Sequence, residues 1–140
     1  MPDRIFLDTN ILIFYISSDE TKKLRAKDLV FAYPEVVVSS QVIGEFISVC
    51  FSKNLLTSEK IGKSSNTFMN TFDFYPIVES TINRALQVKK VYKYSFWDSL
   101  IIASALENNC NILFSEDMQD GQTIEDSLKI VNPFPKIVHN

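Results

Sequence analysis

The sequence predicts an α/β fold, a three-layer α/β/α sandwich around a mainly parallel central sheet of about five strands. Short apolar runs at 5–7, 36–38 and 112–114 are typical of strands covered on both faces. Longer segments with helical periodicity separate them, which is the alternation that such a sandwich requires. With 140 residues and 46% hydrophobic content, we expect a single domain over 1–140.

The first half of the chain is expected to alternate strands and helices. In order, a strand, two helices, a strand and a helix are predicted at 5–7, 10–16, 20–32, 36–38 and 41–51. Pro34 ends the second helix, because proline cannot continue a helix. Ser39 and Ser40 follow the β-branched strand and can cap the next helix.

The second half continues the pattern. A helix, a short strand, two helices and two strands are predicted at 58–70, 74–77, 79–92, 95–109, 112–114 and 129–131. Pro76 places the short strand at an edge of the sheet, because proline cannot donate to a neighbouring strand. The segment between the last two strands is expected to be a loop or a short helix, with a turn at Gly121.

Charge and composition exclude several classes. The net charge is −3, so the chain has no general basic coat for nucleic acid. No apolar run approaches the roughly 20 residues of a membrane helix, and the N-terminus does not resemble a signal peptide. Cys50 and Cys110 lie in or beside apolar helical segments, so we expect buried thiols in a cytoplasmic protein without a membrane anchor.

Asp8 stands where the first strand stops, with Thr9 and Asn10 beside it. Ligands of open α/β sheets collect outside the carboxyl ends of the strands, so a carboxylate there is well placed to bind one. The alternative is that Asp8 only caps the following helix.

Glu45 and Asp98 are candidates on helices. Glu45 lies at the border of an apolar stripe, just after Gly44, and the alternative is an ordinary solvated acid. Asp98 has capping-box spacing to Ser95, yet its helix is apolar on most sides. A carboxylate on such a face needs a partner, which a cap, a cation or a metal would supply.

The strand at 112–114 also runs straight into polar residues, from Ser115 through Asp117. The alternative interpretation is that these polar residues only form a solvated loop. If the strands at 5–7 and 112–114 are neighbours, Asp8, Glu45, Asp98 and Asp117 can converge in one crevice. Four carboxylates gathered in this way would repel one another. Mg²⁺ or Mn²⁺ would relieve this repulsion, because both ions prefer oxygen ligands, and such a site suits phosphodiester hydrolysis.

Four stretches carry a family resemblance: Leu7–Leu12, Glu45 after a capped helix start, Phe96–Ala103 and Ser115–Asp117. They resemble the motifs of PIN-domain nucleases, in particular the VapC-type toxins of prokaryotic toxin–antitoxin pairs. The resemblance implies a PIN-like fold and a metal-dependent endoribonuclease. It further implies Mg²⁺ or Mn²⁺ as cofactor, RNA as substrate, an antitoxin protein as partner, and a homodimer.

By that resemblance the acids Asp8, Glu45, Asp98 and Asp117 form the catalytic metal site, with Thr9, Asn10 and Ser115 as polar support. Glu116 and Asp120 lie close enough to compete for the role of Asp117.

Other classes fit less well. A haloacid-dehalogenase-like phosphatase also opens with a strand and an Asp, but needs a second acid where this chain has Asn10. A receiver domain needs an acidic pair in the first loop, which is not evident. A histidine-dependent ribonuclease is disfavoured, because the only histidine, His139, is the penultimate residue of an expected tail. A catalytically inactive PIN-like module that binds RNA or protein stays open.

Overall fold

A central sheet of six strands runs through the computed structural model, which describes residues 2–134. The strands are β1 (Arg4–Leu7), β2 (Glu35–Ser39), β3 (Asp73–Tyr75), β4 (Ile112–Phe114), β5 (Thr123–Ile124) and β6 (Leu128–Val131). Their order across the sheet is β3-β2-β1-β4-β6-β5. All pairings are parallel except that of β5 with β6. The mainly parallel sheet predicted from the sequence is therefore confirmed.

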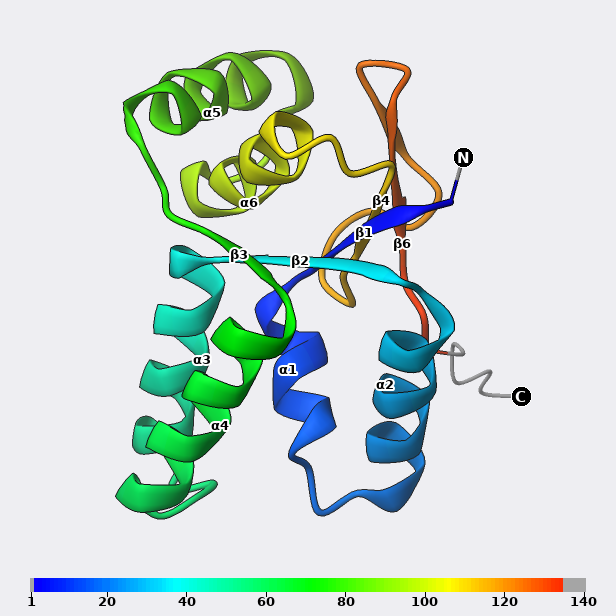
Figure 1. The fold of residues 1–140 in the computed structure, drawn as a ribbon. Helices are drawn as coiled ribbons and strands as arrows, with labels where there is room; N and C mark the ends of the chain where they lie inside the picture. The colour runs from blue at the N-terminus through cyan, green and yellow to red at the C-terminus, as the bar shows by residue number, and fades with distance from the viewer. Residues whose placement is uncertain (1, 135–140) are drawn as a thin grey trace, which may run out of the picture.

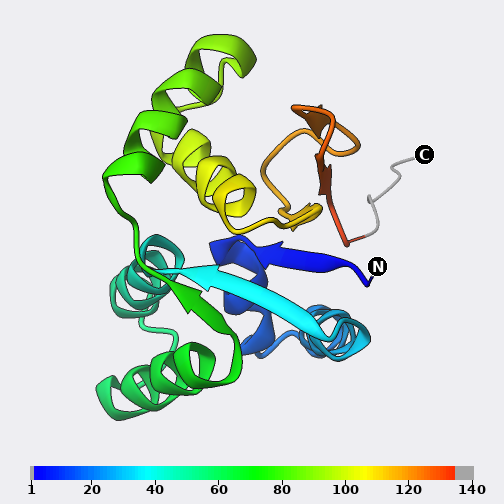
Figure 2. The same cartoon turned by 45° about the horizontal axis from the view of Figure 1, so that its top comes forward.

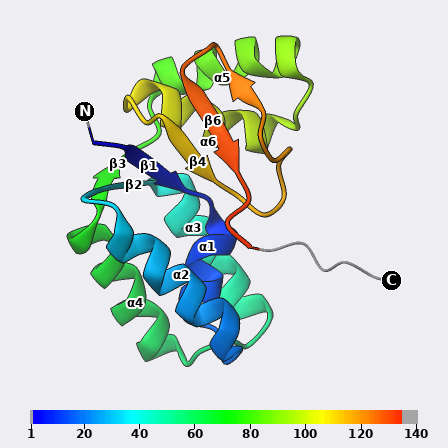
Figure 3. The ribbon, with the colours of Figure 1, turned by 90° about the vertical axis from the view of Figure 1, so that its right-hand side faces the viewer.

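Helices cover both faces of this sheet. They are α1 (Thr9–Tyr15), α2 (Glu20–Ala32), α3 (Ser40–Ser52), α4 (Ser58–Thr71), α5 (Glu79–Tyr92) and α6 (Phe96–Glu107). Helices α1 to α4 lie on one face, and α5 with α6 on the other (Figures 1 and 2). Seen from the side, β4 and β6 run next to each other between the two helical layers (Figure 3). The three-layer sandwich is confirmed.

Strand β1 lies in the middle of the sheet because its side chains are apolar on both faces. Ile5, Phe6 and Leu7 are all fully buried. From β1 the chain continues outward through β2 and β3, then returns to place β4 on the other side of β1. Neighbouring strands whose connections run in opposite directions open a crevice at their carboxyl ends. The condition for convergence of the four acids, adjacency of the first and fourth strands, is met.

Strand β5 is one strand more than the sequence indicated. It has only two residues, too short for an apolar run to be recognised. The turn into β6 places Glu125 and Asp126 at φ of 50° and 57° without the glycine that usually marks such turns. The expected loop is therefore partly a hairpin. The prediction of an edge strand near Pro76 is confirmed, because β3 lies at the edge and ends at Tyr75.

Helix α6 is buried nearly all round, as expected from its composition. Every residue from Ser99 to Leu106 is buried between the sheet and α5. Both cysteines are buried free thiols, and burial raises the pKa of Cys110 to about 12. No helix in the described residues is both long and apolar enough to cross a membrane.

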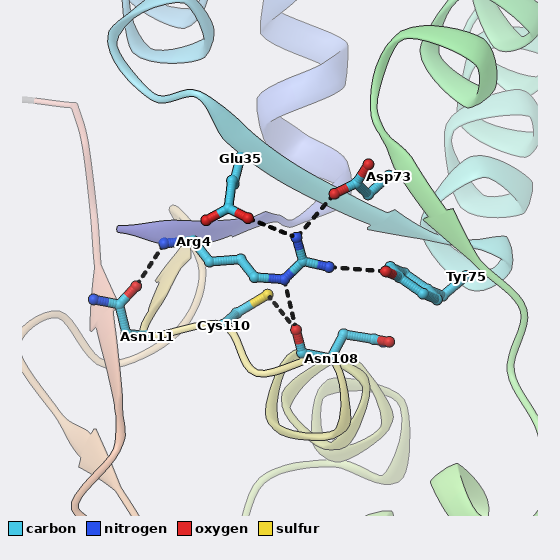
Figure 4. Close-up of polar contacts among 7 residues, drawn as sticks. All are labelled: Arg4, Glu35, Asp73, Tyr75, Asn108, Cys110 and Asn111. Carbon is cyan, nitrogen blue, oxygen red and sulfur yellow. Dashed lines mark hydrogen bonds and ion pairs between the residues drawn. The ribbon is translucent and has the colours of Figure 1, made fainter. Parts of the chain in front are cut away.

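Arg4 ties the amino end of β1 to its neighbours (Figure 4). Its guanidinium donates to Asp73 Oδ2 at 2.8 Å and lies 3.6 Å from Glu35 Oε1. It also donates to the Tyr75 hydroxyl at 2.9 Å and to the carbonyl oxygen of Asn108 at 2.8 Å. One side chain thus links β1, β2, β3 and the end of α6, and its charge is fully paired.

Candidate active site

Asp8 lies at the opposite end of β1, directly after its last residue, and is only 4% exposed. Its Oδ1 accepts a hydrogen bond from the Thr9 amide at 2.7 Å, so it does cap α1. Its Oδ2 accepts from the Ser115 hydroxyl at 2.7 Å, and Ser115 follows β4. The carboxylate therefore bridges the carboxyl ends of the two adjacent central strands.

Glu45 is brought to Asp8 through Thr9. The Thr9 hydroxyl donates to Glu45 Oε2 at 3.0 Å, across 36 positions of sequence. The Gln41 amide donates to Glu45 Oε1 at 2.7 Å, one turn earlier on α3. Glu45 is half-buried, at the border of the apolar face as predicted. A freely solvated acid would not have both oxygens held in this way.

Asp98 reaches the same end of the sheet from the first turn of α6. Its backbone amide donates to the Ser95 hydroxyl at 3.1 Å, which confirms the predicted cap. The Gln41 amide also donates to the carbonyl oxygen of Trp97 at 3.0 Å, so one side chain fastens the start of α6 to α3. The Asp98 carboxylate is half-buried.

Asp117 approaches from the loop after β4. Its Oδ2 accepts from the Asn10 side-chain amide at 3.0 Å. All three acids are exposed, and they differ in their contacts: Asp120 Oδ1 accepts from the Asn132 backbone amide at 2.8 Å, and the Glu116 backbone amide donates to Asn10 Oδ1 at 3.3 Å. Of the three acids weighed for the fourth position, Asp117 is the one whose carboxylate Asn10 holds beside α1.

The charges of these acids affect one another. Burial raises the pKa of Asp8 to about 6, and the charges of Asp98 and Glu45 add to it, although its hydrogen bonds from Ser115 and Thr9 oppose the shift. Burial likewise raises the pKa of Asp98, with further contributions from the charges of Asp117 and Glu45. The four charges thus act on one another, and ionisation is disfavoured at Asp8 and Asp98.

Basic side chains do not relieve this repulsion. Among residues 2–134, the ion pairs involve Arg4, Lys63 and Arg84, and none includes one of the four acids. The repulsion can be lowered by protonation or by a cation from solution.

The donor set fits a hard divalent cation by chemistry, because it offers only oxygen atoms in a cluster of uncompensated negative charge. Within the described residues, no three His, Cys, Asp or Glu side chains are grouped closely enough to hold one ion by themselves. Mg²⁺ usually takes only one or two carboxylates and completes its shell with water and phosphate oxygens. The arrangement suits that partial kind of coordination.

Gln41 was not among the residues predicted for the site. Its distance of four residues from Glu45 on α3 is the only local signal, since side chains one helical turn apart can meet. Its second contact, with Trp97, joins segments 56 positions apart and has no sequence signature.

The comparisons with known proteins agree with this geometry. The family model of the PIN domain matches residues 5–119, so the chain belongs to the PIN domain family. No curated protein matches the chain.

Solved structures share the fold. A toxin–antitoxin complex from Klebsiella pneumoniae is 21% identical with a TM-score of 0.71, over 93% of this chain and 98% of that chain. VapC20 of Mycobacterium tuberculosis, described as a toxin that cleaves the sarcin–ricin loop, is 17% identical with a TM-score of 0.67, over 81% and 91%. DNA-bound VapBC of Salmonella typhimurium is 16% identical with a TM-score of 0.68, over 94% and 99%.

Proposed function

We propose that this chain is an endoribonuclease that hydrolyses phosphodiester bonds of RNA with Mg²⁺ or Mn²⁺ bound among the carboxylates of Asp8, Glu45, Asp98 and Asp117, of which one or two would ligate an ion directly. The observation that carries the proposal is the gathering of these carboxylates at the crevice between β1 and β4, with no basic counterion among residues 2–134. Membership of the PIN domain family and the likeness to an RNA-cleaving toxin support it.

The chain's own residues prepare this site. Ser115 and Thr9 fix both oxygens of Asp8, so the carboxylate is oriented before any ligand binds. Thr9 and Gln41 do the same for Glu45. When bound, a divalent cation would lower the pKa of an attacking water and stabilise charge on the phosphate. The expected products carry 5′-phosphate and 3′-hydroxyl ends.

We also propose that the protein is the toxin of a type II toxin–antitoxin pair, acting as a cytoplasmic homodimer and held inactive by an antitoxin protein. The similar structures include a toxin–antitoxin complex and a DNA-bound VapBC, which supports a partner of this kind. Expression of the protein alone should arrest growth, and co-expression with its antitoxin should relieve the arrest and yield a complex that co-purifies.

A haloacid-dehalogenase-like phosphatase is disfavoured by the side chains around Asp8. Both oxygens of that carboxylate already accept hydrogen bonds, which suits a fixed ligand better than a free nucleophile. The position of the required second acid is Asn10, whose amide donates to Asp117. The effect of Mn²⁺ distinguishes the ribonuclease from a module that only binds RNA or protein. A metal site in the folded protein must raise the melting temperature by mass action, whereas a binding-only module should gain nothing from Mn²⁺.

The test is a cleavage assay on mixed cellular RNA with Mn²⁺ or with chelator. Wild-type protein and Asp98→Asn are compared, with Asp120→Asn as matched control because its backbone bond to Asn132 survives the change. Cleavage that needs Mn²⁺ and Asp98 but not the Asp120 carboxylate supports the proposal. Equal cleavage by Asp98→Asn contradicts it, and a folded protein that gains no stability from Mn²⁺ favours the binding module.

A further inference from the structure

An open pocket of about 570 Å³ lies beside the acid cluster. It is lined by Ser40, Gln41, Gly44, Glu45, Ser48 and Trp97. Its volume falls within the roughly 300–1,000 Å³ of small-molecule sites. Glu45 belongs both to this pocket and to the acid cluster, and Trp97 directly precedes Asp98. The pocket and the proposed cleavage site therefore meet at Glu45.

The floor of the pocket is one face of α3. Ser40, Gly44 and Ser48 follow one another at intervals of four residues, so their small side chains share that face. A Cβ atom at Gly44 would meet nothing within 4 Å, so the space above the helix is open.

The wall of the pocket is the indole of Trp97. It is 64% exposed, and Phe96 packs against it edge-on at 5.3 Å between ring centroids and 77° between planes. An edge contact of this kind leaves an aromatic face free to stack with another flat ring.

A polar atom in the lining lacks its partner. The Gln41 amide nitrogen donates to Glu45 and to the Trp97 carbonyl oxygen, so its orientation is determined. Gln41 Oε1 is then left buried with no donor from any of the described residues. A buried acceptor without a donor is costly and points to a missing partner.

We propose that this pocket receives a nucleobase of the RNA strand, stacked on Trp97 and next to the phosphate at the acid cluster. The inference rests on the proposed ribonuclease function. Stacking on an aromatic side chain accepts any base and needs no positive charge, which suits a chain of net charge −3.

Binding can be read directly, because Trp97 is the only tryptophan in the chain. An Asp8→Asn variant, used so that the strand is not cut, is titrated in Mn²⁺ with a single-stranded RNA of about six nucleotides. We expect a saturable change in tryptophan fluorescence, and none with an abasic ribose-phosphate strand of the same length. An equal response to both strands would overturn the proposal.

Filling the pocket provides a matched pair of variants. Gly44→Leu places a side chain over the pocket floor, while Gly62→Leu changes a glycine of α4 whose Cβ also meets nothing within 4 Å. We expect the first change, and not the second, to weaken binding of the RNA by roughly tenfold. Equal affinity of the two variants would contradict the proposed location.

Cleavage kinetics separate this proposal from the function on which it rests. Trp97→Ala should raise KM for mixed RNA by roughly five- to a hundredfold and change kcat by less than about threefold, with Trp97→Phe between it and wild type. Phe31→Ala, at another exposed aromatic residue on α2, should match wild type. All Trp97 variants should keep the wild-type melting temperature.

Each result then decides one of the two proposals. If wild type cleaves RNA and Trp97→Ala cleaves with unchanged KM, the base pocket is wrong and the ribonuclease stands. If the RNA alters Trp97 fluorescence but no RNA is cut, the pocket stands and the ribonuclease is wrong. Without fluorescence change or cleavage, both are wrong.

Discussion

The two ends of strand β1 differ in how the charges of their acidic side chains are compensated. At the amino end, Arg4 donates to Asp73 and lies beside Glu35, so the acids there have a cation from the chain itself (Figure 4). At the carboxyl end, Asp8 has only neutral donors and negative neighbours, and its pKa rises to about 6. The same strand thus begins in a paired charge network and ends in an unpaired one.

The buried polar atoms without a hydrogen-bond partner also lie near only one end of β1. Among the described residues, two buried side-chain atoms lack a hydrogen-bond partner, Gln41 Oε1 and Ser99 Oγ. Gln41 contacts Glu45 and Ser99 follows Asp98, so both belong to the acid end. Proteins leave such groups unsatisfied chiefly where function requires it. The contrast indicates that the amino end stabilises the fold, while the carboxyl end is kept ready for ligands from outside.

The largest effect is expected from removing a carboxylate at the acid end. Asp8→Asn should lower the rate of RNA cleavage by roughly a hundred- to a thousandfold, comparable to loss of one preorganised catalytic contact. The fold should persist, because asparagine can still accept from Ser115 or Thr9. Initial rates in Mn²⁺ with a melting curve check both points. A wild-type rate would show that this end is not catalytic.

The next largest effect is a loss of stability as the pH rises. Because the folded pKa of Asp8 is raised to about 6 from an ordinary value of 3.8, ionising it disfavours the native state. Without metal, the free energy of unfolding should fall by about 2.4 kcal/mol as pH rises from about 4 to about 7. Asp98 shifts in the same direction.

Denaturant melts in chelator at several pH values measure this fall. Mn²⁺ should restore stability at neutral pH, and Asp8→Asn should flatten the pH dependence. A stability that rises through this pH range would mean that the acid end is not electrostatically strained.

A substitution at the amino end of β1 should lower stability and leave cleavage unchanged, the reverse of what we expect for Asp8→Asn. Arg4→Met should lower the free energy of unfolding by about 2 kcal/mol, because it removes the donors of Asp73, Tyr75 and Asn108, and the exposure of Asp73 and Glu35 limits the loss. Cleavage by the folded fraction should be unchanged. Arg4→Lys should recover only part of the stability, because ammonium lacks the planar fork. Loss of catalysis without loss of stability would erase the distinction between the ends.

The smallest effect concerns Ser99. Ser99→Ala should stabilise the protein by up to about 1 kcal/mol, because it removes a buried hydroxyl without a partner from a helix and adds a better helix former. Ser65→Ala is the matched control, since that buried hydroxyl donates to the Ile61 carbonyl oxygen at 2.8 Å. Thermal melts compare the two. Equal destabilisation by both would mean that Ser99 has an unseen partner.

Much of the fold could be predicted because its signals are local. The apolar run of β1, the caps at Ser39 and Ser95, and the edge position of β3 all depend on residues within a few positions of one another. Strand β5 escaped prediction because a two-residue strand and a turn through Glu125 and Asp126 carry no such signal.

For the candidate site, the residue types were apparent from the sequence and their contacts were not. Asp8 follows an apolar strand and Asp98 starts an apolar helix, so both stand out locally. The bonds that join the cluster, from Thr9 to Glu45 and from Ser115 to Asp8, span 36 and 107 positions. Gln41 was missed because its role depends on a carbonyl group in α6.

By itself, the sequence determined the type and approximate position of every helix and of five of the six strands among residues 2–134, because capping, periodicity and proline act within about one helical turn. It also determined that acids follow two apolar strands. Only the tertiary structure decided that β1 and β4 are neighbours and that Arg4 pairs the acids of one end, while the acids of the other end have no counterion in the described part of the chain. Those outcomes depend on distances between segments far apart in the chain, which packing of the whole core establishes.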